Sequence, residues 1–174
     1  MVGGAAGRAI GRLTGLMRLV LIAVGRLKAG PEAELAARYG DRAAKAGRAL
    51  GFKGPDVLVL DESRLAETAA RKAEEAAAIR RHKAGRLILL DERGKSLGSA
   101  DFAARLGRWK DAGEAAATLV IGGPDGLDPA LQAEADLTLS FGALTWPHQL
   151  VRIMAMEQLY RAMTILAGHP DRKS

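Results

Sequence analysis

The chain has 174 residues, which is enough for one globular domain with a buried core. It contains no cysteine, which excludes disulfides and thiolate metal sites, and its three widely separated histidines do not favour a histidine metal site. A formal charge of +6 and a pI near 10.0 favour an anionic partner such as nucleic acid, although basicity alone is a weak signal.

No apolar run approaches the roughly 20 residues that a membrane-spanning helix needs. We therefore expect a cytoplasmic protein without a membrane segment or a resident metal. Residues 1–16 are rich in Gly and Ala and predict a disordered extension. The functional domain is then expected to cover residues 17–174, beginning at Met17.

Five short apolar runs predict buried strands, and the charged or amphipathic stretches between them predict helices. The strands are expected at residues 19–24, 56–60, 87–90, 117–121 and 137–141. The helices are expected at residues 31–50, 61–83, 99–111, from Asp128–Pro129 onward, and at 148–166. Strands that alternate with helices indicate an α/β fold with a largely parallel sheet covered on both faces.

The last predicted helix is apolar over most of its circumference. Its apolar residues include Leu150, Ile153, Met156, Leu159 and Met163, which occupy more than one stripe of a helical wheel. Such a helix has to be covered on two sides. We expect the sheet on one side and a second copy of the chain on the other, and hence a homodimer.

Ligands of α/β sheets bind at the carboxyl ends of strands, and three such ends stand out. They are Leu90–Asp91, the glycine-rich segment Ile121–Gly126, and the loop Phe141–Trp146. Glycines there let a ligand approach the backbone, but they are equally compatible with plain turns. His148 opens the final helix, where it is either a hydrogen-bonding group of a site or a surface residue.

Several common sites have no support in the sequence. Neither G-x-G-x-x-G nor the Walker A pattern occurs, which weakens dinucleotide and nucleoside-triphosphate interpretations. A G-x-S-x-G nucleophile elbow is also missing, so hydrolase chemistry has no local basis.

Three ordered motifs resemble the family of ribosomal RNA large-subunit methyltransferases H (RlmH). They are Ile121–Leu127, the stretch from Leu139 to Arg152, and Glu157–Ala162. The opening Met17–Gly25 and the segment Leu89–Lys95 fit as well, so the likeness extends from Met17 to about Pro170. Three motifs in consistent order make the resemblance far more specific than any one of them.

The resemblance implies a SPOUT-type fold, with a parallel-rich sheet flanked by helices and a C-terminal trefoil knot. It further implies a homodimer that binds S-adenosylmethionine in the knot and methylates N3 of a pseudouridine in 23S rRNA of the assembled ribosome. The cofactor would contact eight residues: Leu90, Gly122, Phe141, Gly142, Ala143, Leu144, Thr145 and Trp146.

Methylation at N3 needs removal of the N3 proton and stabilisation of negative charge on the ring. We expect His148 to accept the proton or orient the base, and Arg152 and Arg161 to act as electrostatic clamps. Either arginine is also compatible with a contact to RNA phosphate or to the other subunit.

The tail departs from the family pattern. Members usually end in a His-Pro-Tyr-His-Arg-like sequence, whereas this chain reads His169-Pro-Asp-Arg-Lys-Ser174. Cofactor binding is expected to survive, but substrate recognition is put in doubt. The tail keeps open an RNA-binding protein of the same fold without activity. Basicity and the strand-end glycines keep open a second alternative, an α/β protein that binds another nucleotide.

Overall fold

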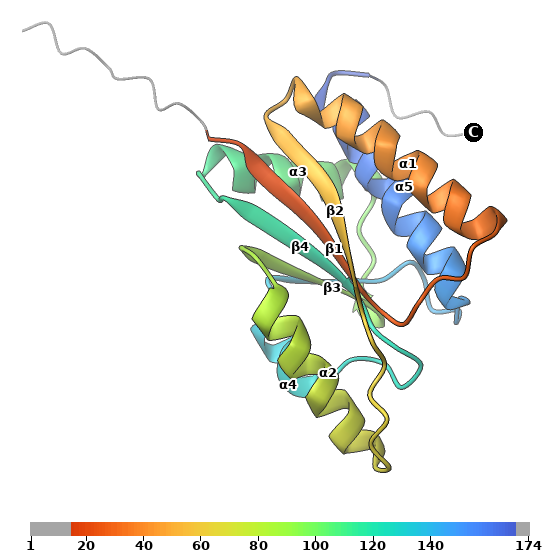
Figure 1. Ribbon diagram of the computed structural model, residues 1–174. Coiled ribbons are helices and arrows are strands. Elements are labelled where there is room, and N and C mark those ends of the chain that lie inside the picture. Colours follow the sequence, from red (N-terminus) through yellow and green to blue (C-terminus); the bar gives the residue numbers. More distant parts are fainter. Residues whose placement is uncertain (1–14, 170–174) are drawn as a thin grey trace, which may run out of the picture.

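The computed structural model describes residues 15–169 and consists of a five-stranded parallel sheet between two layers of helices (Figure 1). The strands are β1 (Met17–Val24), β2 (Phe52–Leu60), β3 (Arg86–Lys95), β4 (Ala116–Ile121) and β5 (Leu137–Leu139). The helices are α1 (Pro31–Arg48), α2 (Thr68–His82), α3 (Ser99–Asp111), α4 (Pro129–Glu134) and α5 (His148–Leu166). The predicted extension lies largely outside the described residues, and the altered tail from residue 170 onward lies wholly outside them.

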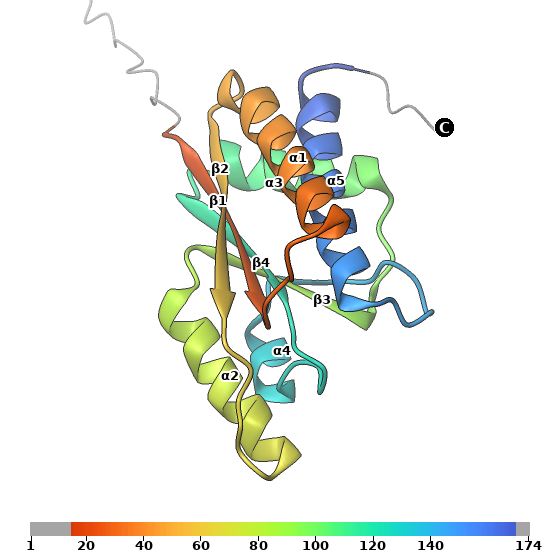
Figure 2. The same ribbon diagram turned by 45° about the vertical axis from the view of Figure 1, so that its right-hand side comes forward.

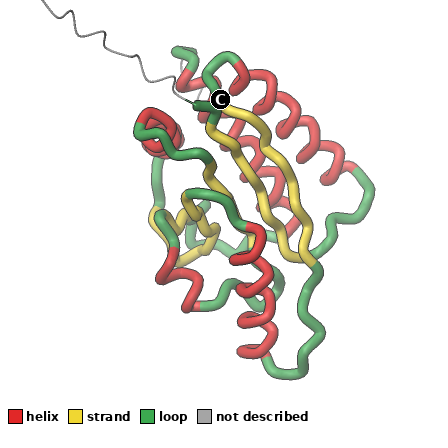
Figure 3. The backbone as a smooth tube through the Cα atoms, turned by 60° about the vertical axis from the view of Figure 1, so that its left-hand side comes forward, coloured by secondary structure: helices red, strands yellow, loops and turns green. Residues whose placement is uncertain are grey.

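The sheet has the order β2-β1-β4-β3-β5, and every pairing is parallel. Connections that move toward β2 (β1 to β2, β3 to β4) carry α1 and α3, and those that move toward β5 carry α2 and α4. Right-handed crossovers place these two groups on opposite faces, as Figure 2 shows. In Figure 3 the strands accordingly lie between helices on both sides.

Alternating side chains of each strand enter two separate cores. On β1, Leu19, Leu21 and Ala23 join the core beneath α1, α3 and α5. The intervening Val20, Ile22 and Val24 join the core beneath α2 and α4. Burial on both faces explains why β1 and β4 are continuous apolar runs, from which the sequence predicts their position well.

The helix predicted at residues 61–83 begins seven residues later, at Thr68, and this is a correction. Residues 61–67 form a loop whose backbone groups are satisfied by side chains. The N–H of Ser63 donates to Glu75 Oε1 (3.1 Å), and the carbonyl oxygens of Leu65 and Ala66 accept from Arg71. With these partners the segment needs no helical hydrogen bonds.

Strand boundaries need smaller corrections. The third strand runs on to Lys95 beyond the predicted stop at Asp91, and the fifth ends at Leu139, before Phe141. Beyond Leu139, the Ser140 hydroxyl accepts from the N–H of Gly142 (3.0 Å), and a side-chain turn replaces the ladder. The N–H of Ser140 donates to the carbonyl of Lys95 (2.9 Å), so the C-terminal stretch lies against the end of β3. A trefoil knot in this region stays a prediction.

Helix α5 is covered mainly within the chain. It packs against α1, α3 and the core of its own sheet face, and Figures 1 and 2 show α1 and α5 side by side. The wide apolar surface from which we inferred a second subunit is therefore largely explained by α1 and α3. Near the start of α5, three apolar side chains stay exposed: Leu144 (72%), Trp146 (40%) and Leu150 (40%).

Candidate functional site

A cleft of about 750 Å³ lies at the carboxyl edge of the sheet. From β1 the chain leaves toward β2 and from β4 toward β5, so two adjacent strands send their loops in opposite directions and open a crevice between them. The loops after β1, β2, β4 and β5 reach this crevice, as does the C-terminal half of β3 from Leu90 to Arg93. Its volume falls in the range of sites for small organic ligands.

The glycine-rich loop after β4 forms one wall of the cleft. A Cβ atom on Gly122 would lie 2.9 Å from Leu127 Cδ2, and one on Gly123 would lie 3.2 Å from Val24 Cγ1. The loop closes with a 3.0 Å hydrogen bond from the N–H of Gly126 to the carbonyl of Gly123. Close packing against Leu127 and Val24 therefore explains the paired glycines, and it leaves their backbone at the cleft surface.

The loop between β5 and α5 forms the facing wall. Gly142 adopts a φ of 114°, and Thr145 Oγ1 donates to Glu92 Oε2 (3.2 Å) across to the end of β3. Of the eight residues predicted to bind a cofactor, seven line the cleft: Leu90, Gly122, Phe141, Gly142, Leu144, Thr145 and Trp146. Ala143, the eighth, lies in the same loop but is exposed and does not line it.

His148 is the one predicted catalytic residue that lines the cleft. Its Nε2 is buried and has no hydrogen-bond partner within residues 15–169. Burial, reinforced by the neighbouring Arg152 guanidinium, lowers the pKa of His148 below its usual 6.5, although Glu62 and a backbone hydrogen bond with Gly122 oppose the shift. The imidazole is therefore neutral at pH 7, a state in which it can accept a proton.

The two predicted arginines lie outside the cleft lining. Arg152 is 5% exposed, and its Nη2 donates to the carbonyl of Gly25 (2.8 Å), whereas its Nε has no partner among the described residues. Arg161 lies further along α5, where its Nε donates to Glu157 Oε1 (2.9 Å). Within one chain the structure thus brings Arg152 beside His148 but does not bring Arg161 to the site.

Sequence reasoning missed an acidic residue of the cleft, Glu62. Its Oε1 lies 2.8 Å from the position that a Cβ of Gly25 would occupy, and it lines the cleft together with Asp91, Glu92 and Asp125. The charged pattern of residues 61–83 predicts a solvated helix there and so hides this residue. Its position two residues beyond the end of β2 is the signal that would have identified it, because that end belongs to the same sheet edge.

The described part of the chain contains neither a membrane-spanning helix nor a cluster of metal-ligating side chains. Within residues 15–169 no helix is long and apolar enough to cross a membrane. In the same range no three histidine, aspartate or glutamate side chains gather where they could hold a metal ion.

A parallel α/β sheet with a cleft of this size at its topological switch point defines a protein that binds a small polar ligand between strand-end loops. A family model described as predicted SPOUT methyltransferase matches residues 17–171. The chain belongs to the SPOUT methyltransferase family.

Its relatives share most of its length. A protein named ribosomal RNA large subunit methyltransferase H from Rhodopseudomonas palustris (strain HaA2) is 59% identical over 160 residues, which are 91% of this chain and 100% of the relative. Proteins of the same name from Bradyrhizobium sp. (strain BTAi1 / ATCC BAA-1182) and Sinorhizobium fredii (strain NBRC 101917 / NGR234) are 57% and 58% identical over the same shares.

Among solved structures, a probable methyltransferase from Bordetella pertussis Tohama I aligns with a TM-score of 0.49 and 14% identity. The alignment covers 86% of this chain and 95% of that one. A likeness this loose adds nothing to the family assignment.

Proposed function

We propose that this protein transfers a methyl group from S-adenosylmethionine to N3 of a pseudouridine in 23S rRNA, acting as a cytoplasmic homodimer on the assembled ribosome. Membership of the SPOUT methyltransferase family and the name of the relatives support the proposal. The structural observation that carries it is the cleft itself, where the C-terminal half of β3 meets the loops after β4 and β5.

The cleft suits a ligand with an adenine ring and a positive charge. Leu90, Leu144 and Trp146 offer apolar surface on which a flat ring can pack, and the backbone of the loop 141–146 offers hydrogen-bonding groups. Among the acidic side chains of the lining, Asp91 is paired with Arg93 (3.1 Å), and Glu62 is the one that we expect to favour a cation such as a sulfonium. When bound, S-adenosylmethionine supplies an electrophilic methyl group.

The N3–H of pseudouridine lies between two carbonyls, so its nitrogen becomes nucleophilic only as the proton leaves. We infer that His148, which lines the cleft and whose pKa is lowered, takes that proton. In the transfer, the N3 lone pair would form the bond to the methyl carbon, and the electrons of the broken carbon–sulfur bond would stay on sulfur. Arg152 would hold Gly25 in place and keep His148 neutral by its charge, and Arg161 would act as an electrostatic clamp or an RNA contact.

A second copy of the chain would explain the apolar side chains at the cleft opening. Leu144, Trp146 and Leu150 are all at least 40% exposed, and they lie together between β5 and the first turn of α5. Burying them against a partner would stabilise a dimer and exclude water from the cleft. Sedimentation equilibrium should give twice the 18.3 kDa chain mass.

The decisive assay is transfer of labelled methyl from S-adenosylmethionine to purified ribosomes, with naked 23S rRNA as the control. We expect ribosomes to be methylated and naked rRNA to be a poor substrate. His148→Asn should lower the single-turnover rate about 100-fold or more, because a general base contributes that much. His82→Asn, at the far end of α2, is the matched control that should leave the rate unchanged.

The alternative, an RNA-binding protein of the same fold without activity, rests on the altered tail. In that case the protein would bind both S-adenosylmethionine and ribosomes but would transfer no labelled methyl group. Failure to bind S-adenosylmethionine even at millimolar concentration would instead favour a protein for another nucleotide.

A further inference from the structure

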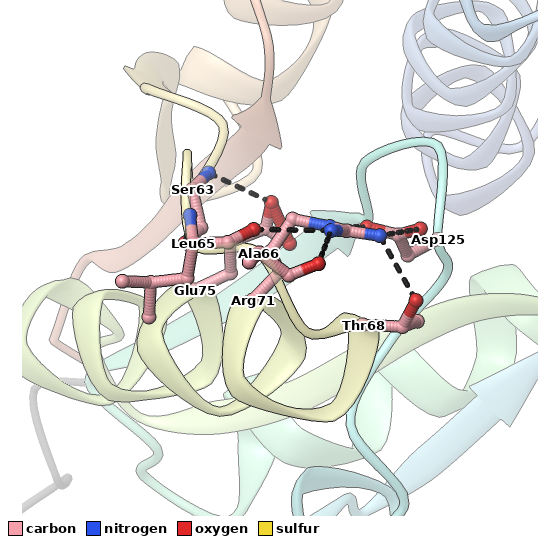
Figure 4. A network of polar contacts seen from close by, with 7 residues as sticks. All are labelled: Ser63, Leu65, Ala66, Thr68, Arg71, Glu75 and Asp125. Carbon is pink, nitrogen blue, oxygen red and sulfur yellow. Dashed lines mark hydrogen bonds and ion pairs between the residues drawn. The ribbon is translucent and has the colours of Figure 1, made fainter.

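An arginine outside the cleft links two of the loops that form it. Arg71, in the first turn of α2, makes a forked ion pair with Asp125 of the glycine-rich loop (Figure 4). Its Nε donates to Asp125 Oδ2 (2.7 Å) and its Nη2 to Asp125 Oδ1 (3.1 Å). Arg71 and Asp125 are 54 residues apart in the sequence, so this contact ties α2 to the loop after β4.

The remaining N–H groups of Arg71 are also used, and they hold the loop 61–67. Nη1 donates to the carbonyl oxygens of Leu65 (3.0 Å) and Ala66 (2.7 Å), and Nη2 donates to Thr68 Oγ1 (2.9 Å). A guanidinium has five N–H groups, and all five have a partner here. The planar fork therefore fixes both loops relative to each other, which a lysine could not do.

Glu75, one turn further along α2, lies against the same two loops. It is 6% exposed, and its Oε1 accepts a hydrogen bond from the N–H of Ser63 (3.1 Å). The same oxygen lies 3.4 Å from the position that a Cβ of Gly123 would occupy. Glu75 thus lies close to the glycine-rich loop without lining the cleft.

Both loops provide cleft lining, whereas Arg71 and Glu75 do not. Glu62 comes from the first loop, and Gly122 to Gly126 come from the second. We propose that Arg71 is a positioning residue for the methyl donor, which sets the cleft wall by clamping Asp125 to the loop 61–67. This inference rests on the proposed function and adds to it a residue that shapes cofactor affinity without touching the cofactor.

The chain offers a matched control on the same helix. Arg80, also on α2, forms an ion pair with Glu134 of α4 (Nε to Oε1, 3.0 Å), again across 54 residues. Neither Arg80 nor Glu134 lines the cleft. A purely structural role for Arg71 would therefore make Arg71→Ala and Arg80→Ala behave alike.

The experiment is calorimetric titration of the full-length protein with S-adenosylmethionine, together with thermal denaturation and steady-state methyl transfer to ribosomes. We expect Arg71→Ala to raise the Kd about tenfold, with kcat at saturating cofactor within about twofold of wild type. Arg80→Ala should change the Kd by less than about twofold. Arg71→Lys should fall between wild type and Arg71→Ala, because it keeps the charge but loses the fork.

A double variant distinguishes a specific effect of the Arg71–Asp125 ion pair on cofactor binding from a general destabilisation of the protein. If Arg71 acts through Asp125, then Arg71→Ala/Asp125→Ala should bind the cofactor about as weakly as the weaker of its two single variants. Independent, additive losses would overturn the proposal, as would equal Kd values for Arg71→Ala and Arg80→Ala. If Arg71→Ala does not fold, a wild-type Kd for Arg71→Lys would overturn it. Absence of binding by the wild type would refute the proposed function and this inference together.

Discussion

Replacing Arg152 with methionine should affect the stability of the fold and the rate of methyl transfer in opposite directions. The guanidinium is buried, has a carbonyl as its partner and leaves Nε without one in the described part of the chain. Burial of this kind lowers the pKa of Arg152, which shows that the charged form is disfavoured there. Methionine has similar length and flexibility but no charge to desolvate.

Two opposing contributions set the magnitude. The hydrogen bond from the charged donor to Gly25 contributes about 1.5–3 kcal/mol, and its loss leaves that carbonyl without this partner. Desolvation of a buried cation costs several kcal/mol. We therefore expect Arg152→Met to be between neutral and about 2 kcal/mol more stable, which raises the Tm by up to about 6 °C.

The same substitution should impair the reaction. Removing the positive charge of Arg152 raises the pKa of His148, so at a given acidic pH more of the imidazole is protonated and unable to accept a proton. The acid limb of the single-turnover rate should shift to higher pH. Loss of the anchor on Gly25 should weaken cofactor binding as well.

Thermal denaturation at pH 8, where His148 is neutral with or without Arg152, and rate measurements across pH 5.5–8 test both parts. A Tm that falls by more than about 4 °C would show that the charge stabilises the fold. An acid limb that does not move would show that His148 is not the proton acceptor. Arg80→Met, which breaks an ion pair with Glu134 away from the cleft, is the control that should leave the pH profile in place.

Three further predictions concern stability. Burial raises the pKa of Glu75 above 4.5, so the ionised carboxylate destabilises the folded state at higher pH. Glu75→Gln should therefore raise the Tm at pH 8. This gain in Tm should vanish below pH 4.5, where the carboxyl group is protonated in both states. Gly85→Ala should cost about 3 kcal/mol or more, because at a φ of 65° its Cβ would lie 1.9 Å from the carbonyl oxygen of Ala116. Thr118→Val should cost about 1–3 kcal/mol by removing both hydrogen bonds to the backbone of Ala84.

Controls for these three are available in the chain. Gly113 has a φ of 86° but nothing within 4 Å of its added Cβ, so Gly113→Ala should cost only about 1 kcal/mol. Equal losses at Gly85 and Gly113 would rule out the backbone clash as the cause. A Tm gain for Glu75→Gln that persists unchanged at pH 4 would contradict the ionisation argument, and Thr118→Ser should retain most of the stability lost in Thr118→Val.

The local sequence pattern was sufficient to predict those elements of this protein whose structure depends on residues close together in the sequence. The apolar runs of β1 and β4 identify buried strands because both faces are covered, and Asp128 and Pro129 open α4 as predicted. Parallel strands place their carboxyl ends at one edge, so the amino-acid sequence is enough to predict that Leu90 of β3 and the loops after β4 and β5 lie together.

Contacts between distant residues were decided only by the tertiary structure. Arg152 meets Gly25 across 127 residues, and Arg71 meets Asp125 across 54. No periodicity encodes such pairings, since each depends on the strand order β2-β1-β4-β3-β5 and on which face every crossover helix takes. For the same reason the local pattern of residues 61–67 predicts a helix, and the segment becomes a loop only where Arg71 and Glu75 supply its hydrogen bonds.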